Sequence, residues 1–229
     1  MRALVVVLLG LAGLAVLGDR LAEWVAERQV AQVVAERGGL PATPDVEIGG
    51  FPFLTQALGG RYDDVRVVVR SADVGPGEVT GIDVTLRGVQ VPLSDVLGGV
   101  VQEVPVERVD GTATLSYDLL SDELGEGTTL EQEGDGLRIT RTVELAGQEL
   151  PLTAVGTVSL DGDELVVDVD EASGAGVDLP RVLVNRAGDL LDLRYPIEAL
   201  PFGLELTGVR PAADGVVVTV VATDTVLSG

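Results

Sequence analysis

Apolar and polar residues alternate along most of the chain after Pro44, with the two-residue period of β-strands. The alternation is clearest in five runs of residues: 61–69, 82–87, 112–117, 137–145 and 165–170. Short segments rich in Gly, Pro and Asp separate these runs and indicate turns. Strands with one apolar and one polar face are typical of antiparallel sheets. Residues 216–221 are apolar on both faces, so we expect them to form the most buried strand.

Residues 52–60 predict a short helix between the strands. Pro52 suits a first helical turn, and Gly59-Gly60 suits the end of a helix, where a left-handed residue is favoured. The apolar residues of the segment fall on one helical face: Phe53, Leu54, Ala57 and Leu58. Three of the six Phe and Tyr residues of the chain lie between positions 51 and 62. This concentration of aromatic side chains indicates that the helix covers something apolar.

Two further segments repeat the pattern of a Pro start and a Gly stop. They are residues 91–99 and, more loosely, residues 179–188. Because Pro is a common start signal and Gly a common stop signal of helices in general, the likeness does not by itself show an internal repeat. The acidic, Gly-rich stretches 121–128 and 171–176 are predicted to be exposed loops.

The N-terminus carries an apolar stretch, residues 3–18, between Met1-Arg2 and Asp19-Arg20. Its length fits the core of a secretory signal and falls short of the ~20 residues that span a bilayer. Residues 21–34 look helical, so without cleavage the two segments would form one anchor helix. The sequence leaves signal and anchor open, and both export the remainder of the chain. We therefore expect a signal peptide or membrane anchor at 1–18, a helical segment at 19–40 and a single domain at 41–229.

Composition removes much of the chemistry that enzymes use. The chain has no Cys and no His, and all 15 of its basic residues are Arg. Thiolate, imidazole and lysine mechanisms and soft metal sites are therefore excluded, which leaves the chemistry of carboxylates, hydroxyls and Arg. We expect no metal and no cofactor. Paired acids such as Asp63-Asp64 could serve a glycosidase, but no cluster of Trp or Tyr accompanies them as a sugar platform. The net charge of −22 also repels nucleic acid.

Two alternatives remain for the apolar interior. Either the sheet layers fill it with their own side chains, or part of it receives a lipid. A buried methylene contributes about 0.8 kcal/mol, so a plain aliphatic groove can compete with a membrane for an acyl chain. The residue pattern alone does not decide between a lipid carrier and a membrane-tethered structural or adaptor protein with a filled core.

Four blocks, in this order, resemble the LmeA-like phospholipid-binding family of actinobacteria. They are residues 50–65, 88–97, 108–117 and 200–209, the last followed by Asp214-Gly215 and Ala222-Thr-Asp224. The resemblance implies a non-enzymatic, extracytoplasmic (periplasmic) protein of the cell envelope that binds phospholipid at the outer face of the plasma membrane. In mycobacteria such proteins are linked to mannan elongation in lipoglycan biosynthesis, which implies envelope glycosyltransferases as partners. The implied fold is an elongated, curved α+β structure of mostly antiparallel sheets with short Pro-started helices, similar to tubular lipid-binding domains.

We expect ten residues to line or gate an acyl groove. Nine are apolar, and Arg61 is included because its guanidinium could pair bidentately with a lipid phosphate. The set is Phe51, Phe53, Leu54, Leu58, Arg61, Leu93, Val96, Leu97, Leu200 and Phe202.

Overall fold

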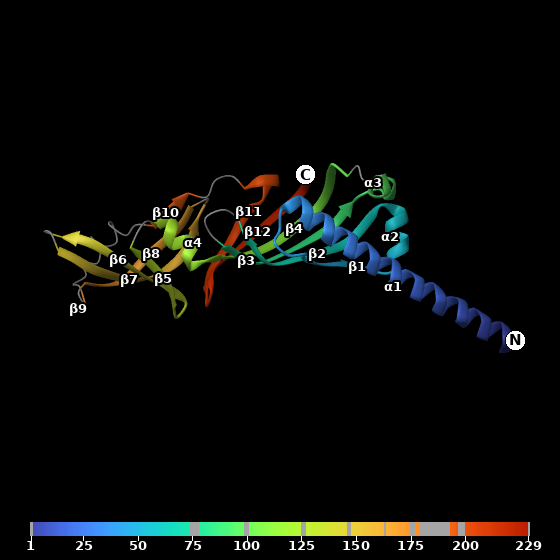
Figure 1. The fold of residues 1–229 in the computed structure, drawn as a ribbon, viewed down its shortest axis with the longest axis horizontal. Coiled ribbons are helices and arrows are strands. Elements are labelled where there is room, and N and C mark those ends of the chain that lie inside the picture. The colour runs from blue at the N-terminus through green and yellow to red at the C-terminus, as the bar shows by residue number, and fades with distance from the viewer. Residues whose placement is uncertain are drawn as a thin grey trace. The chain divides into compact units, whose positions relative to one another are not determined.

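The computed structural model shows an α+β protein with two mostly antiparallel open sheets, a few short helices and one long N-terminal helix (Figure 1). It describes residues 2–73, 78–98, 101–124, 127–145, 148–162, 164–174, 177–178, 193–196 and 200–228. The described helices are α1 (Arg2–Gly38), α2 (Phe53–Gly59), α3 (Leu93–Gly98), α4 (Tyr117–Leu124) and the 3-10 turn η1 (Pro201–Gly203). The fold class predicted from the alternating pattern is confirmed.

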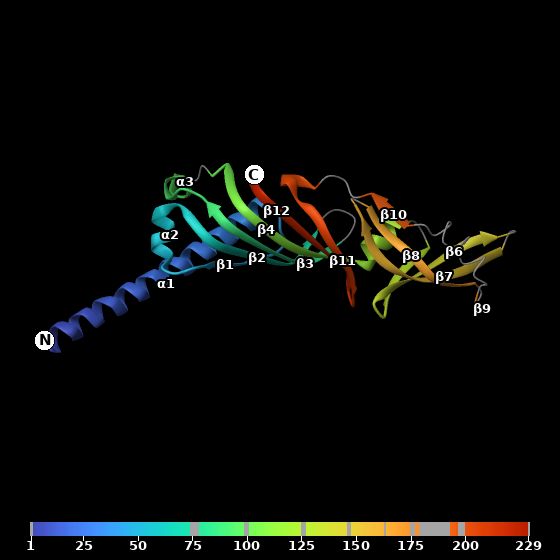
Figure 2. The ribbon, with the colours of Figure 1, turned by 180° about the vertical axis from the view of Figure 1, so that it is seen from behind.

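The two sheets have six strands each. The first has the order β1 (Asp45–Gly49), β2 (Arg61–Asp73), β3 (Glu78–Gln90), β4 (Glu103–Ser116), β12 (Gly215–Ser228) and β11 (Glu205–Ala212). The second has the order β10 (Leu193–Pro196), β8 (Glu164–Gly174), β7 (Gln148–Asp161), β6 (Gly136–Leu145) and β5 (Thr128–Glu133), with β9 (Val177–Asp178) paired to β8. Figure 2 shows the same strands from behind.

The chain divides into two compact units. Unit 1 comprises Met1–Arg70, Asp83–Gly111 and Ala222–Gly229, and unit 2 comprises Ser71–Ile82 and Thr112–Val221.

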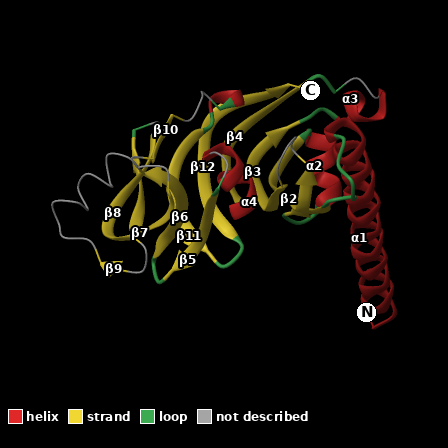
Figure 3. Ribbon diagram, turned by 60° about the vertical axis from the view of Figure 1, so that its left-hand side comes forward, coloured by secondary structure: helices red, strands yellow, loops and turns green. Residues whose placement is uncertain are grey.

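In unit 1, the register of β1 on β2 separates an apolar face from a charged face. Val46 lies opposite Val67 and Ile48 opposite Val65, and three of these four side chains are buried while Val67 is half-buried. The alternate positions carry ion pairs between neighbouring strands: Arg70–Asp45, Arg66–Glu47, Arg66–Asp83, Arg87–Asp64 and Arg87–Asp110. Figure 3 shows α1 and α2 beside these strands.

The hydrogen-bonded guanidinium groups shift the pKa of two carboxyls on this charged face. The bond from Arg66 lowers the pKa of Asp83, and the bond from Arg108 lowers the pKa of Asp110. These pairs are exposed to solvent, so each contributes little to stability.

Unit 2 holds its own hydrophobic core. Its buried members come from four strands: Leu130, Leu137, Ile139, Val167 and Val216. The Tyr117 hydroxyl, at the start of α4, donates a hydrogen bond of 2.7 Å to the Ala212 carbonyl at the end of β11. Gly215 begins β12 directly after the turn, where a Cβ would clash with the Leu115 carbonyl. The Asp214-Gly215 motif therefore contains the one residue type that fits this close backbone approach.

Three local predictions are wrong in part. The predicted strand at 112–117 ends at Ser116, and the first part of the predicted loop at 121–128 belongs to α4, which ends at Leu124. The helix forms because Ser116 Oγ accepts the Leu119 N–H and the apolar side of the helix packs on the core, while residues 125 and 126 lie outside the described residues. Residues 171–174 of the predicted loop at 171–176 continue β8 to Gly174, and Ala172 is buried against β7, while residues 175 and 176 lie outside the described residues. The segment 216–221, expected to be the most buried strand, lies on β12, where residues 216 and 217 are buried, residues 218–221 are half-buried and none of the six is exposed.

Candidate lipid-facing site

The predicted helix at 52–60 is present as α2. It ends at Gly59, and Gly60 takes the left-handed conformation with φ of 65°. The Gly60 carbonyl accepts the Val91 N–H at 2.9 Å, and a Cβ on Gly60 would stand 3.1 Å from the Pro92 Cα. The second Pro-started segment is present as α3, directly after Pro92. The third, at 179–188, lies outside the described residues. The double glycine thus ends α2 and lets the start of α3 approach it.

The N-terminus of α2 is capped by Asp19 of α1, a residue more than thirty positions away. The N-cap residue Pro52 makes no side-chain capping bond. Instead the Asp19 carboxylate accepts the N–H of Phe53 at 3.0 Å and that of Leu54 at 2.8 Å. Asp19 is only 3% exposed although it directly follows the apolar stretch. Two orphan amides of α2 are satisfied in this way.

The second half of α1 contacts the rest of unit 1. Glu27 accepts the Ile48 N–H of β1 at 2.9 Å, Ala31 is buried, and Arg37 donates to the Val101 carbonyl at 3.2 Å. The large apolar residues of α1 before Asp19 are exposed. The helix runs without a break across the boundary between Gly18 and Asp19. One helix therefore joins the apolar stretch directly to the unit that holds α2.

The structure divides the apolar residues of α2 into two stripes. Phe53 and Ala57 are buried, and the Phe53 ring packs against Tyr62 with a centroid distance of 6.3 Å. Leu54 and Leu58 point away from unit 1 and are exposed, Leu58 to 78%. Positions four apart share a helical stripe, which explains the separation. The four residues predicted to share one apolar face are therefore divided: Phe53 and Ala57 belong to the core, and Leu54 and Leu58 lie on the surface.

Phe51 joins the exposed stripe. It lies just before α2 and is 56% exposed. The Arg20 guanidinium stands 5.4 Å from the centre of its ring and also donates hydrogen bonds to the Glu23 carboxylate. We call Phe51, Leu54 and Leu58 the apolar ridge. Sequence reasoning missed Asp19 and Arg20, whose only signal was their position as the first polar residues after the apolar stretch.

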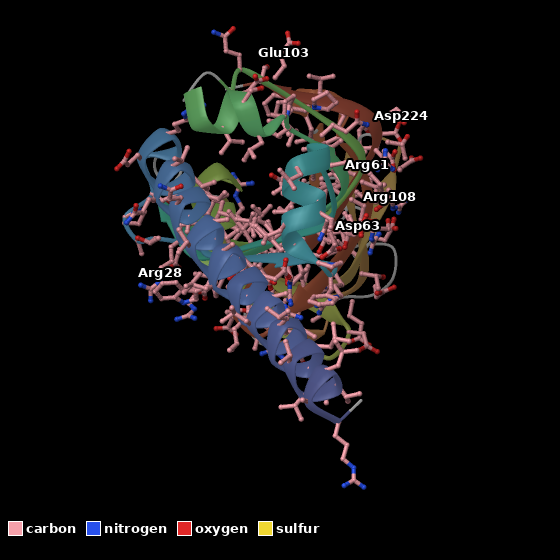
Figure 4. All side chains as sticks on the ribbon, turned by 90° about the vertical axis from the view of Figure 1, so that its right-hand side faces the viewer. Arg28, Arg61, Asp63, Glu103, Arg108 and Asp224 are labelled. Atoms are coloured by element: carbon pink, nitrogen blue, oxygen red, sulfur yellow. The ribbon has the colours of Figure 1, made fainter. Side chains whose placement is uncertain are left out.

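Arg61 is engaged within the protein. Its guanidinium forms an ion pair with Glu107 of 2.7 Å, and both side chains are about half exposed. Figure 4 shows Arg61, Asp63 and Arg108 together on one side of unit 1, and Arg28 on the other side, where α1 lies. A lipid phosphate at Arg61 would therefore compete with Glu107.

The other predicted site residues are spread over the two units. On α3, Leu93 is half-buried and Val96 is exposed, while the side chain of Leu97 lies outside the described part of the structure. Leu200 is half-buried and Phe202 is exposed, and both belong to unit 2. Phe202 has a positive φ of 60° inside η1.

The apolar inner face of the sheet in unit 1 is incompletely covered. Val65 and Val69 are buried there, whereas Val67, Val84 and Leu86 are only half-buried. By contrast, the opposite face of β1 and β2 carries a charged recess of about 350 Å³, lined by Asp45, Val46, Glu47, Arg66, Val68 and Arg70. Its ion-paired lining does not suit acyl chains. Among the described residues, no group of three or more Asp and Glu side chains is arranged to hold a metal ion.

No curated protein and no solved structure matches the chain significantly. The profile of one family, described as LmeA-like phospholipid-binding, matches residues 17–221. The match begins just before Asp19 and includes α2, the ridge, all of unit 2 and most of unit 1. Since it covers most of the 229 residues, the chain belongs to the LmeA-like phospholipid-binding family.

Proposed function

We propose that the protein is a non-enzymatic phospholipid-binding protein of the cell envelope, held at the extracytoplasmic face of the plasma membrane by α1. The observation that carries this proposal is the exposed apolar ridge, fixed by Asp19 to the end of an exposed apolar helix. Membership of a phospholipid-binding family supports the same conclusion.

The length and composition of α1 support attachment to a membrane. It has 37 residues, its most apolar window has a mean hydropathy of 2.1, and 6% of that window is buried against the protein. A core helix of a soluble protein would bury most of such a window. Retained as an anchor, α1 would hold unit 1 at the outer membrane surface, whereas a cleaved export signal would only carry the protein across the membrane.

Acyl chains would contact apolar surface that the fold leaves uncovered. Burying a large aliphatic or aromatic side chain completely contributes about 1.5–3 kcal/mol. Contact with Leu58, Leu54 and Phe51 would give a lipid part of this burial energy. The half-buried inner face of β2 and β3 would contribute an additional part. In this proposal Phe53 supports the site from the protein core and does not contact the lipid directly, because its side chain is buried. The residues of α3 and of η1 complete the predicted lipid-binding set.

We include in the proposal a role beside envelope glycosyltransferases in mannan elongation, which the family resemblance implies. The runner-up function is a membrane-tethered adaptor with a filled core. Phe53 does not discriminate between the two, because an Asp at a buried position unfolds either protein. Leu58 does discriminate, since it is exposed and tolerates a charge.

The test uses the full chain purified from membranes in a mild detergent. Native mass spectrometry and lipid extraction measure co-purified phospholipid for the wild type, for Leu58→Asp and for Val226→Asp. Val226 is the matched control, since it is exposed and apolar in unit 1 but lies on β12. We expect phospholipid in the wild type and the control and a clear loss in Leu58→Asp, with all three folded. A lipid-free wild type that takes up no phospholipid from vesicles would support the adaptor instead.

A further inference from the structure

We infer that the apolar ridge (Phe51, Leu54 and Leu58) inserts into the outer boundary of the bilayer beside α1, with Arg20 at the level of the lipid phosphates. This inference rests on the part of the proposed function that places α1 in the membrane. It adds a surface through which unit 1 itself contacts the bilayer, in addition to any lipid bound within the protein.

The first argument is the length of the apolar stretch. Arg2 and Arg20 bracket it, and at 1.5 Å per residue they lie about 27 Å apart along α1. This distance is slightly less than the ~30 Å thickness of the hydrocarbon core, so both guanidinium groups would reach the two phosphate layers. With so short a segment, there is no room for a spacer between the membrane and unit 1.

The second argument is the position of the ridge relative to the end of the apolar stretch of α1. Asp19 bonds to the first two amides of α2, so α2 starts at the membrane boundary of α1. Phe51 lies under the Arg20 guanidinium and so shares its depth. Trp24, the only Trp of the chain, is exposed about 6 Å beyond Arg20 along the helix, where interfacial aromatic residues are enriched.

The third argument is that three acids of α1 close to the ridge have partners within the protein. The Asp19 carboxylate is buried and holds two N–H groups, Glu23 is paired with Arg20, and Glu27 accepts the Ile48 N–H. The net charge of −22 repels anionic lipid headgroups over most of the surface. Contact with the bilayer is therefore favoured where apolar side chains are exposed and the acids have partners.

The test uses the natural absence of Cys, which allows single-site labelling of the full chain. Leu58→Cys and the matched control Val226→Cys carry an environment-sensitive fluorophore and are reconstituted into vesicles of phosphatidylcholine and phosphatidylglycerol. Nitroxides on the upper acyl chains quench fluorophores in the bilayer, and iodide quenches those in water. We expect strong nitroxide quenching and several-fold weaker iodide quenching at position 58, with the reverse at position 226. Trp24 of the unlabelled wild type provides a second readout, and we expect nitroxide quenching there as well.

Equal iodide quenching at both labelled positions would overturn the inference. So would a position 58 that is shielded from iodide but not quenched by the nitroxide lipids, which would show that protein, such as a second copy, covers the ridge. Phospholipid content, measured on the same samples, separates this inference from the proposed function. A protein that is lipid-free but inserts its ridge refutes internal lipid binding alone, and a protein that holds lipid with an exposed ridge refutes insertion alone.

Discussion

Replacing Asp19 by Ala should release α2 from α1. The variant removes the acceptor of two backbone N–H groups, those of Phe53 and Leu54, at 3.0 and 2.8 Å. A hydrogen bond to a charged group contributes about 1.5–3 kcal/mol, and loss of an N-cap costs about 0.5–2 kcal/mol. The Leu54 amide is only part-buried and can regain water, so we expect a loss of about 2–4 kcal/mol for the docking of α2.

Hydrogen exchange measured by mass spectrometry on the detergent-solubilised full chain reports this loss directly. A loss of 2–4 kcal/mol corresponds to a fall of roughly 30- to 1,000-fold in amide protection over residues 56–59. The amide protection of α2 in Asp19→Asn should lie between that of the wild type and that of Asp19→Ala, because the side-chain amide oxygen of Asn can accept one N–H. Glu27→Ala is the control: it removes one acceptor, at Ile48 of β1, and should leave α2 protected. Protection of α2 within about threefold of wild type in Asp19→Ala would refute the assignment of Asp19 as its cap.

Three further outcomes follow from the structure. Phe53→Ala should lower the stability of unit 1 by about 3–4 kcal/mol in thermal or denaturant unfolding, because the ring is buried, and an effect under 1 kcal/mol would contradict that packing. Tyr117→Phe should cost unit 2 about 1 kcal/mol through loss of the bond to the Ala212 carbonyl, and an unchanged unfolding midpoint would count against that bond. Because the bond from Arg66 holds the pKa of Asp83 below its ordinary value of 3.8, the pair stabilises the fold above that pH and loses its effect as the pH falls below it. Asp83→Asn should therefore reduce the small acid-induced loss of stability between pH 4 and pH 2 at low salt. An unchanged pH dependence of stability over this range would contradict the prediction.

Much of the secondary structure follows from local pattern. The two-residue alternation identified the strands, because a strand that buries one face must repeat every second residue. Pro52 and Gly59-Gly60 identified α2, because few residue types satisfy the start and the end of a helix. The pattern failed at residues 117–124, where Ser116 caps a helix that packs on the core of unit 2.

The sequence by itself determined the fold class, the apolar N-terminal helix, the short helices near Pro52 and Pro92, and, through the order of its motif blocks, the family. It did not determine which residues of α2 are free. Only the tertiary structure decided that Phe53 faces the core and Leu58 faces outward, and that Asp19 caps α2. Local periodicity reports that a residue lies on an apolar face of a helix. It does not report which part of that face is buried in the fold, and the residue that caps α2 is more than thirty positions away, so no local pattern carries this information.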